Sequence, residues 1–270
     1  MAHTANVPTP FSEATMHWVV QHNLFNEPGF HTLMGVLRRG EIPHTVVKVI
    51  PFDGGVEPTV DVDGPVIVMG SLSLTRYAKR RGWTPGAFLN DNFDFRIWRE
   101  KLGHHLLNAD AQVHRFGDVP PREGPFFIRP CLDDKSFSGM VTTWDDFNAW
   151  RASALALGEG ATVDADTWVA VSPLKHIQRE YRMVVVDGRV VTGSRYKLGD
   201  RVASSPEVEP DVRDFAQAMA DTWTPDRAYV LDVFMHDGGL YVGELNNLNA
   251  AGFYAYDVAK MVDAIEAMPW

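Results

Sequence analysis

Cysteine and long apolar runs are nearly absent from this sequence. Cys131 is the only cysteine among 270 residues, so the chain has no internal disulfide and no metal site built from several cysteines. No segment approaches the roughly 20 consecutive apolar residues of a membrane-spanning helix. The polar N-terminal stretch from Met1 to Pro10 lacks the charged and apolar segments of a secretory signal. We therefore expect a cytoplasmic protein without a membrane partner.

Positive charge is also in short supply. The chain has 25 Lys and Arg residues against 35 Asp and Glu residues, which gives a formal net charge of −10. An excess of acidic residues argues against a general nucleic-acid-binding surface, although it is compatible with a local basic pocket. We expect no nucleic-acid partner.

Several familiar catalytic motifs are missing as well. The sequence contains no Walker-type phosphate loop and no Gly-x-Ser-x-Gly turn. Cys131 has no recognisable catalytic partner, and no internal repeat or low-complexity segment is present. Nothing in the sequence therefore points to a covalent nucleophile.

The first part of the chain alternates between strand and helix patterns. Strands are expected at 17–21, 44–50, 65–69 and 111–116, and helices at 28–39, 72–81 and 95–107. This alternation with short connections predicts a layered α/β lobe with a parallel sheet. Gly70 and Ser71 follow the third strand, where they form either an anion cradle or an ordinary turn. The turn-rich segment 117–124 marks the expected boundary between a lobe at 1–117 and a domain at 118–270.

The next segment delivers basic residues to a strand end and a loop. Phe126–Pro130 is a short apolar strand that carries Arg129, and the polar loop after it carries Lys135. A helix is expected at 144–157 and a strand at 168–171, which leads into Ser172-Pro173-Leu174. We expect a small subdomain at 118–174 and a second one at 175–270.

A basic hairpin follows between Glu180 and Lys197. Asp187-Gly188 predicts a two-residue type I′ turn. Counting outward from that turn pairs Glu180 with Arg195 and places Arg182, Arg195 and Lys197 on one face. Arginines in such a position suit bidentate recognition of phosphate or carboxylate. The alternative is a solvated strand face with an ordinary ion pair, which is worth little.

An acidic hairpin lies between Tyr229 and Asn249. A three-residue loop at 237–239 places Asp232 opposite Glu244, with Asn246, Leu240 and Val242 on the same face. Carboxylates about 5 Å apart repel each other unless a cation lies between them. These hard oxygen ligands on strands suit Mg²⁺ when nucleotide phosphates complete its coordination. The alternative is a solvated face with ordinary surface acids.

Together these segments resemble the ATP-grasp superfamily. Within it, the chain is similar to an arginine- and lysine-marked group of largely uncharacterised phage and bacterial members. The resemblance covers roughly Phe126 to Tyr254. The matching motifs are Phe127-Ile-Arg129-Pro130 with Lys135, Glu180-Tyr-Arg182, Ser194-Arg195-Tyr196, Asp232 with Glu244-Leu-Asn246, and Gly252-Phe-Tyr254. The implied fold class is α/β, with α+β character in the C-terminal lobe: an ATP-grasp fold with an N-terminal layered α/β lobe.

The resemblance also implies roles for individual residues. Asp232, Glu244 and Asn246 are expected on Mg²⁺ ions that bridge the phosphates of ATP. The expected nucleotide contacts are Arg129 in place of the usual lysine, Lys135 in the phosphate flap, the hinge residues Val171, Ser172 and Leu174, and Glu180 with Lys197. Arg182 and Arg195 are expected to be catalytic, beside the phosphate or the acyl substrate. The usual glycine-rich flap is replaced by Leu132-Asp-Asp-Lys-Ser-Phe-Ser.

The implied activity is ligation of a carboxylate to an amine through an acylphosphate, with small-molecule or peptide substrates. Two alternatives stay open: an ATP-dependent phosphotransferase, and a nucleotide-binding protein without catalysis. The sequence does not identify the substrates, the oligomeric state, or the roles of Asn249 and Tyr254.

Overall fold

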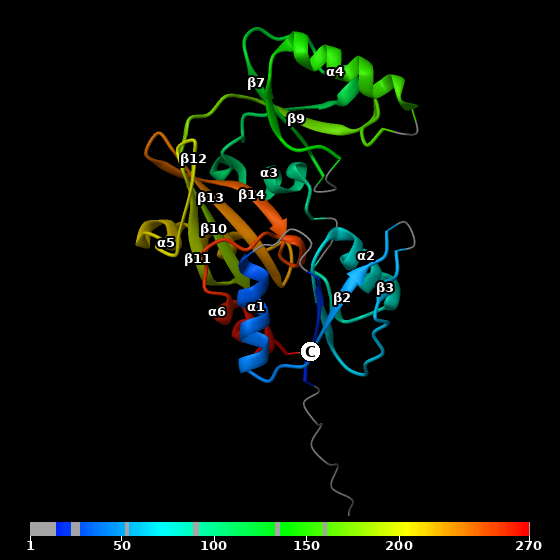
Figure 1. Cartoon of the computed structure of the whole chain (residues 1–270). Helices are drawn as coiled ribbons and strands as arrows, with labels where there is room; N and C mark the ends of the chain where they lie inside the picture. The colour runs from blue at the N-terminus through cyan, green and yellow to red at the C-terminus, as the bar shows by residue number, and fades with distance from the viewer. Residues whose placement is uncertain are drawn as a thin grey trace, which may run out of the picture.

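The computed structural model describes residues 15–22, 28–51, 54–88, 92–132, 136–158 and 161–269. Within these residues the longer strands form three sheets, one for each successive part of the chain (Figure 1). No helix among these ranges is both long enough and apolar enough to cross a membrane.

The N-terminal sheet has the strand order β3-β2-β1-β4-β5. Its strands are β1 (His17–Gln21), β2 (His44–Val49), β3 (Val56–Glu57), β4 (Val66–Met69) and β5 (Pro85–Gly86). Strand β1 is parallel to both β2 and β4, as the alternation of strands and helices predicted. Helices α1 (Pro28–Arg39) and α2 (Leu72–Arg81) follow β1 and β4. Because the chain passes from β1 to one side and later to the other, the carboxyl ends of β1 and β4 flank a topological switch point.

The four-stranded sheet forms the upper lobe in Figure 1, covered by α4 (Trp144–Ala156). Its order is β6 (Gln112–Arg115), β9 (Trp168–Pro173), β7 (Phe126–Pro130) and β8 (Met140–Thr142). Phe116, Phe147 and Val171 belong to its core. The boundary expected after residue 117 falls just behind β6, although β6 pairs with β9 in this sheet.

The central sheet is antiparallel and has the order β12-β11-β10-β13-β14. Its strands are β10 (Ile177–Val186), β11 (Arg189–Leu198), β12 (Arg201–Ser205), β13 (Ala228–His236) and β14 (Gly239–Asn247). One face carries Tyr181, Met183 and Leu231 into a core with α3 (Phe95–Leu102) and α5 (Pro210–Thr222). Part of the other face packs Val184 and Val230 with α1 and α6 (Val258–Glu266).

Helix α3 is shorter than expected. The predicted helix at 95–107 ends at Leu102, because Gly103 has a φ of +53° and a 3₁₀ turn, η1 (Gly103–His105), follows. Two further 3₁₀ turns are η2 (Phe116–Asp118) and η4 (Leu248–Ala250).

The basic hairpin, β10 with β11, has the predicted turn but not the predicted register. Asp187 and Gly188 have φ values of +44° and +74°, and Val186 pairs with Arg189. Two bulges then insert Val191 and Tyr196 into β11, so that Glu180 pairs with Lys197 and Tyr181 with Arg195. The predicted Glu180–Arg195 pair is therefore wrong, because each extra residue moves the following side chains to the opposite face.

The acidic hairpin, β13 with β14, has the predicted central pair for a different reason. Its turn has two residues instead of three, since His236 pairs with Gly239. A bulge at Gly243 compensates for the shorter turn, so Asp232 pairs with Glu244 as predicted. Val242 pairs with Val233 and lies in the core with α3 and α5, so its predicted place, and that of Leu240, on the Asp232 face is wrong.

Candidate active site

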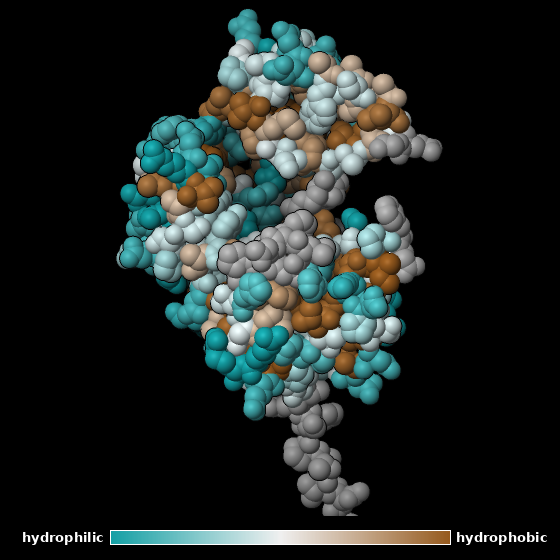
Figure 2. Space-filling view, viewed as in Figure 1, coloured by the Kyte–Doolittle hydropathy of each residue, from teal (hydrophilic) through white to brown (hydrophobic). Residues whose placement is uncertain are grey.

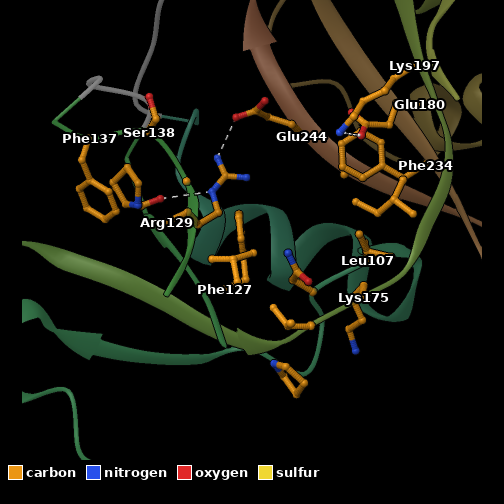
Figure 3. Close-up of a pocket in the computed structure, with 18 of the residues that line it drawn as sticks. Leu107, Phe127, Arg129, Phe137, Ser138, Lys175, Glu180, Lys197, Phe234 and Glu244 are labelled. Atoms are coloured by element: carbon orange, nitrogen blue, oxygen red, sulfur yellow. Dashed lines mark hydrogen bonds and ion pairs between the residues drawn. The ribbon is translucent and has the colours of Figure 1, made fainter. Parts of the chain in front are cut away.

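A cavity of about 590 Å³ lies between the four-stranded sheet and the uncovered part of the central sheet. Figure 2 shows the hollow between the upper lobe and the body below it. Phe127, Arg129 and the segment at 137–141 line it from the upper lobe, and Glu180, Lys197, Phe234 and Glu244 line it from the central sheet. Both walls therefore bring charged side chains to one space (Figure 3).

Arg129 joins the two walls. It is nearly buried on β7, and its Nη2 donates to Glu244 Oε1 on β14 at 3.1 Å (Figure 3). Its Nε donates to the Pro130 carbonyl oxygen at 3.3 Å, and its guanidinium carbon lies 4.9 Å from the centre of the Trp98 ring. The strand therefore holds this arginine with its charge directed at the cavity.

Glu180 and Lys197 form the second ion pair of the cavity. Lys197 Nζ lies 2.8 Å from Glu180 Oε1 across the β10–β11 pair. The Lys197 side chain is 35% exposed, whereas that of Glu180 is 9% exposed. The lysine is thus the more accessible partner.

Arg182 and Asp232 form a buried pair behind the cavity. Arg182 Nε and Nη2 donate to the two Asp232 carboxylate oxygens at 2.8 and 2.7 Å, a bidentate contact between adjacent strands. Arg182 Nη1 also donates to the Gly252 carbonyl oxygen at 3.3 Å. Burial by itself disfavours the charged guanidinium, but the Asp232 carboxylate outweighs it and raises the pKa of Arg182. The pair is fixed in its ionised form.

Two tyrosines that we did not predict as site residues enclose Arg182. The Tyr196 and Tyr254 rings are stacked with centroids 4.5 Å apart, and the Arg182 guanidinium carbon lies 4.9 Å from the Tyr254 centroid. Burial raises the pKa of Tyr196, and the carboxylates of Asp232 and Glu180 raise it further. Tyr196 was expected on the other face. The bulge that it occupies was the missing signal.

The predicted metal ligands lie close together but are already neutralised. Glu244 and Asp232 are cross-strand partners, and Asn246 lies two residues beyond Glu244 on the same strand. The cation that we expected between the carboxylates is supplied by two arginines, Arg182 on Asp232 and Arg129 on Glu244. The Glu244 side chain is 34% exposed and lines the cavity, so its oxygens fit a Mg²⁺ ligand set that phosphates and water complete. Asp232 offers only the remaining lone pairs of its oxygens.

Other predicted site residues lie away from the cavity. Arg195 shares a face with Tyr181, and its Nη1 lies 3.9 Å from Glu209 Oε1. The predicted grouping of Arg195 with Arg182 is therefore wrong, because the bulge at Tyr196 turns Arg195 toward α5. Val171 and Ser172 are buried in β9, whereas Leu174 lines the cavity. Lys135 lies outside the described residues.

Comparisons with known proteins agree with this arrangement. Residues 43–265 match the model of an ATP-grasp domain family, family 3 of the clade marked by two arginines and one lysine. Among curated protein sequences, no relative matches the chain.

Solved structures resemble the chain over nearly its whole length. D-cycloserine synthetase DcsG is 14% identical with a TM-score of 0.61, over 93% of this chain and 98% of that one. D-alanine–D-alanine ligase from Bacillus anthracis is 14% identical with a TM-score of 0.59, over 93% and 92%. ATP-grasp ligase PsnB, complexed with a minimal precursor, is 14% identical with a TM-score of 0.54, over 94% and 98%. At these identities the likeness establishes the fold.

Proposed function

Because the chain belongs to family 3 of the arginine- and lysine-marked clade of ATP-grasp domains, we propose that it is an ATP- and Mg²⁺-dependent carboxylate–amine ligase. One observation carries this proposal. The cavity brings Arg129, Lys197 and Glu244 together from two sheets, directly beside the buried Arg182–Asp232 pair. A site with fixed positive charge and an accessible carboxylate suits a nucleotide and its metal.

We assign the cavity to ATP. Its volume of about 590 Å³ lies within the range of ligand pockets. The connection after β9, including Leu174, and the side chains of Leu107 and Phe234 offer apolar contact for a base. Arg129 and Lys197 offer donors for phosphate oxygens, with Glu180 holding Lys197 in place. Lys135 stays a predicted phosphate contact.

Glu244, Asp232 and Asn246 are the residues that would hold Mg²⁺. When bound, the metal supplies charge neutralisation to the phosphate oxygens of ATP. Arg129 keeps Glu244 directed into the cavity.

The proposed reaction has two steps. A substrate carboxylate oxygen attacks the γ-phosphorus, and ADP leaves, which gives an acylphosphate. The amine nitrogen then attacks the acyl carbon, phosphate leaves, and the nitrogen loses a proton to give the amide. Arg182 places a fixed charge beside the reacting acyl group, so catalysis comes from positioning and electrostatics. Cys131 takes no part, because it is buried and burial raises the pKa of its thiol to about 12.

The test is a screen of amine and carboxylate pairs for ADP release, followed by mass analysis. The substrates that the neighbours' names indicate, amino acids and a precursor peptide, set the first panel. A ligase releases inorganic phosphate and joins the two substrates. Phosphate retained on an acceptor would show a phosphotransferase instead, and binding of ATP without turnover of any pair would contradict an enzymatic role.

A further inference from the structure

A second cavity, of about 180 Å³, lies at the switch point of the N-terminal sheet. The carboxyl ends of β1 and β4, helix α1 and the loop at 249–253 form its walls. In open α/β sheets, ligands bind outside the carboxyl ends of the strands at such a point. Neither the nucleotide nor the metal assigned above accounts for this cavity.

Close backbone contacts hold the walls of this cavity. A Cβ atom on Gly70 would lie 2.5 Å from Gln21 Cβ, so only glycine allows β1 and β4 to end this close together. The Gly70 N–H donates to the Asn249 carbonyl oxygen at 2.8 Å. The buried Asn249 side chain donates to the Val68 carbonyl oxygen at 2.7 Å and accepts from the Phe88 N–H at 2.7 Å. The loop that carries the outer wall is therefore anchored to the N-terminal sheet.

The lining of this cavity is mainly apolar. The apolar contributors are Val20, Phe30, Leu33, Met69, Ala251 and Phe253. Among the described residues that line it, none is Asp, Glu, Lys or Arg, and His22 is the only titratable one. An apolar cavity of about 150 Å³ is large enough for benzene. This cavity therefore suits one uncharged group between an isobutyl group and a phenyl ring in size.

The cavity also borders the proposed reaction centre. Its wall residue Gly252 accepts a hydrogen bond from Arg182. Arg182 holds Asp232, whose cross-strand partner Glu244 lines the nucleotide cavity. Arg182 therefore lies between the two cavities. A group bound in the smaller one places the rest of its molecule beside this arginine.

We propose that the smaller cavity binds the apolar side chain of an amino-acid substrate, either free or at the end of a peptide. This inference rests on the proposed ligase function and adds the class of its substrate. Leucine and phenylalanine are suitable in size, whereas glycine leaves the cavity empty and aspartate and lysine bring an uncompensated charge into it.

The test narrows the cavity with Ala251→Leu and uses Ala152→Leu, on the exposed face of α4, as a matched control. Probes are leucine, phenylalanine, glycine, aspartate and lysine, with Leu-Gly and Gly-Leu as peptide sources. We expect wild type and the control to prefer leucine over glycine in kcat/KM of ADP release. In Ala251→Leu that preference should fall at least tenfold, while the Mg·ATP-induced rise in Tm persists. A preference for charged probes, or an unchanged preference in Ala251→Leu, overturns the inference.

A direct binding measurement separates this inference from the ligase proposal. If no pair of probes releases ADP, calorimetry with phenylalanine still tests the cavity. Saturable binding to wild type and to Ala152→Leu, at least tenfold weaker in Ala251→Leu, supports an apolar side-chain site in a protein that is not a ligase. Equal binding to all three proteins, or none to any of them, overturns it.

Discussion

The Arg182–Asp232 and Arg129–Glu244 pairs differ in how far each is closed to ligands. The Asp232 side chain is 2% exposed and both its oxygens accept hydrogen bonds from one guanidinium, whereas Glu244 is 34% exposed and accepts one from Arg129 at 3.1 Å. The closed pair fixes a charge in place. The open pair presents a carboxylate that a metal can share. The site therefore combines a permanent element with an exchangeable one.

The largest expected effect comes from opening the closed pair. Arg182→Met leaves the Asp232 carboxylate buried without its partner, a change that typically costs about 3–5 kcal/mol. We expect a clearly lower free energy of urea unfolding, and the double variant Arg182→Met/Asp232→Leu should recover part of that loss. If the double variant were no more stable than the single one, the pair would not account for the loss.

Glu244→Gln tests the open pair and should affect ligands more than stability. The amide keeps the size of the side chain and an acceptor for Arg129 but removes charge from the proposed metal site. We expect the Mg·ATP-induced rise in Tm, which is absent with EDTA, to disappear together with turnover. The unfolding free energy without ligand should stay close to wild type. An unchanged Mg·ATP response would remove Glu244 from the ligand set.

A matched pair of lysine substitutions sharpens the difference between the two faces of β10–β11. Arg182→Lys keeps the charge but loses the bidentate contact, so turnover should fall at least tenfold, about 1.4 kcal/mol of transition-state stabilisation. Arg195→Lys lies on the face of Tyr181 and α5, so steady-state kinetics should stay within about twofold of wild type. Equal losses in both variants would restore Arg195 to the site.

Glu266 offers a carboxyl group that is paired with an indole N–H instead of a guanidinium, and the smallest effect. Its Oε1 accepts from Trp18 Nε1 at 2.6 Å, and burial raises the pKa of Glu266 although this hydrogen bond opposes the change. The folded protein therefore keeps this proton to a higher pH than the unfolded chain. The free energy of unfolding should fall slightly as the pH rises through the ordinary glutamate range and the raised pKa above it. The effect is small because the side chain is only partly buried.

Glu266→Gln removes the titrating group and checks this expectation. The variant should flatten the pH dependence of the free energy of urea unfolding between about pH 4.5 and 7.5. A slope equal to that of wild type would contradict a raised pKa at this position.

Local patterns were enough to predict much of the fold. The bounds of α1, α2 and β7 match the expected ranges, because apolar periodicity and the glycine after α2 are signals within the segment itself. The ATP-grasp fold and the family were also recognised from the motifs, and both are confirmed. The two-residue strands β3 and β5 were not predicted, since two residues have no period.

The candidate site was predicted only where bulges did not intervene. The Asp232–Glu244 pair was right because a shorter turn and a bulge cancelled, whereas Arg195 and Tyr196 exchanged faces because nothing cancelled the bulge in β11. Bulges are selected by packing against residues distant in sequence, so the alternation within a strand does not reveal them. The smaller cavity was missed for a similar reason, since Gln21, Gly70 and Asn249 meet only in the fold.

Gly243 shows that a single inserted residue can determine where a carboxylate points. A Cβ at this position would lie 2.3 Å from a ring carbon of Phe234, so glycine is required as well as the extra length. Deleting this residue would turn Glu244 and Asn246 together from the cavity into the apolar core. Any relative that lacks one residue in this strand must therefore be aligned with its gap at Gly243, or its acidic residues will be compared with core positions.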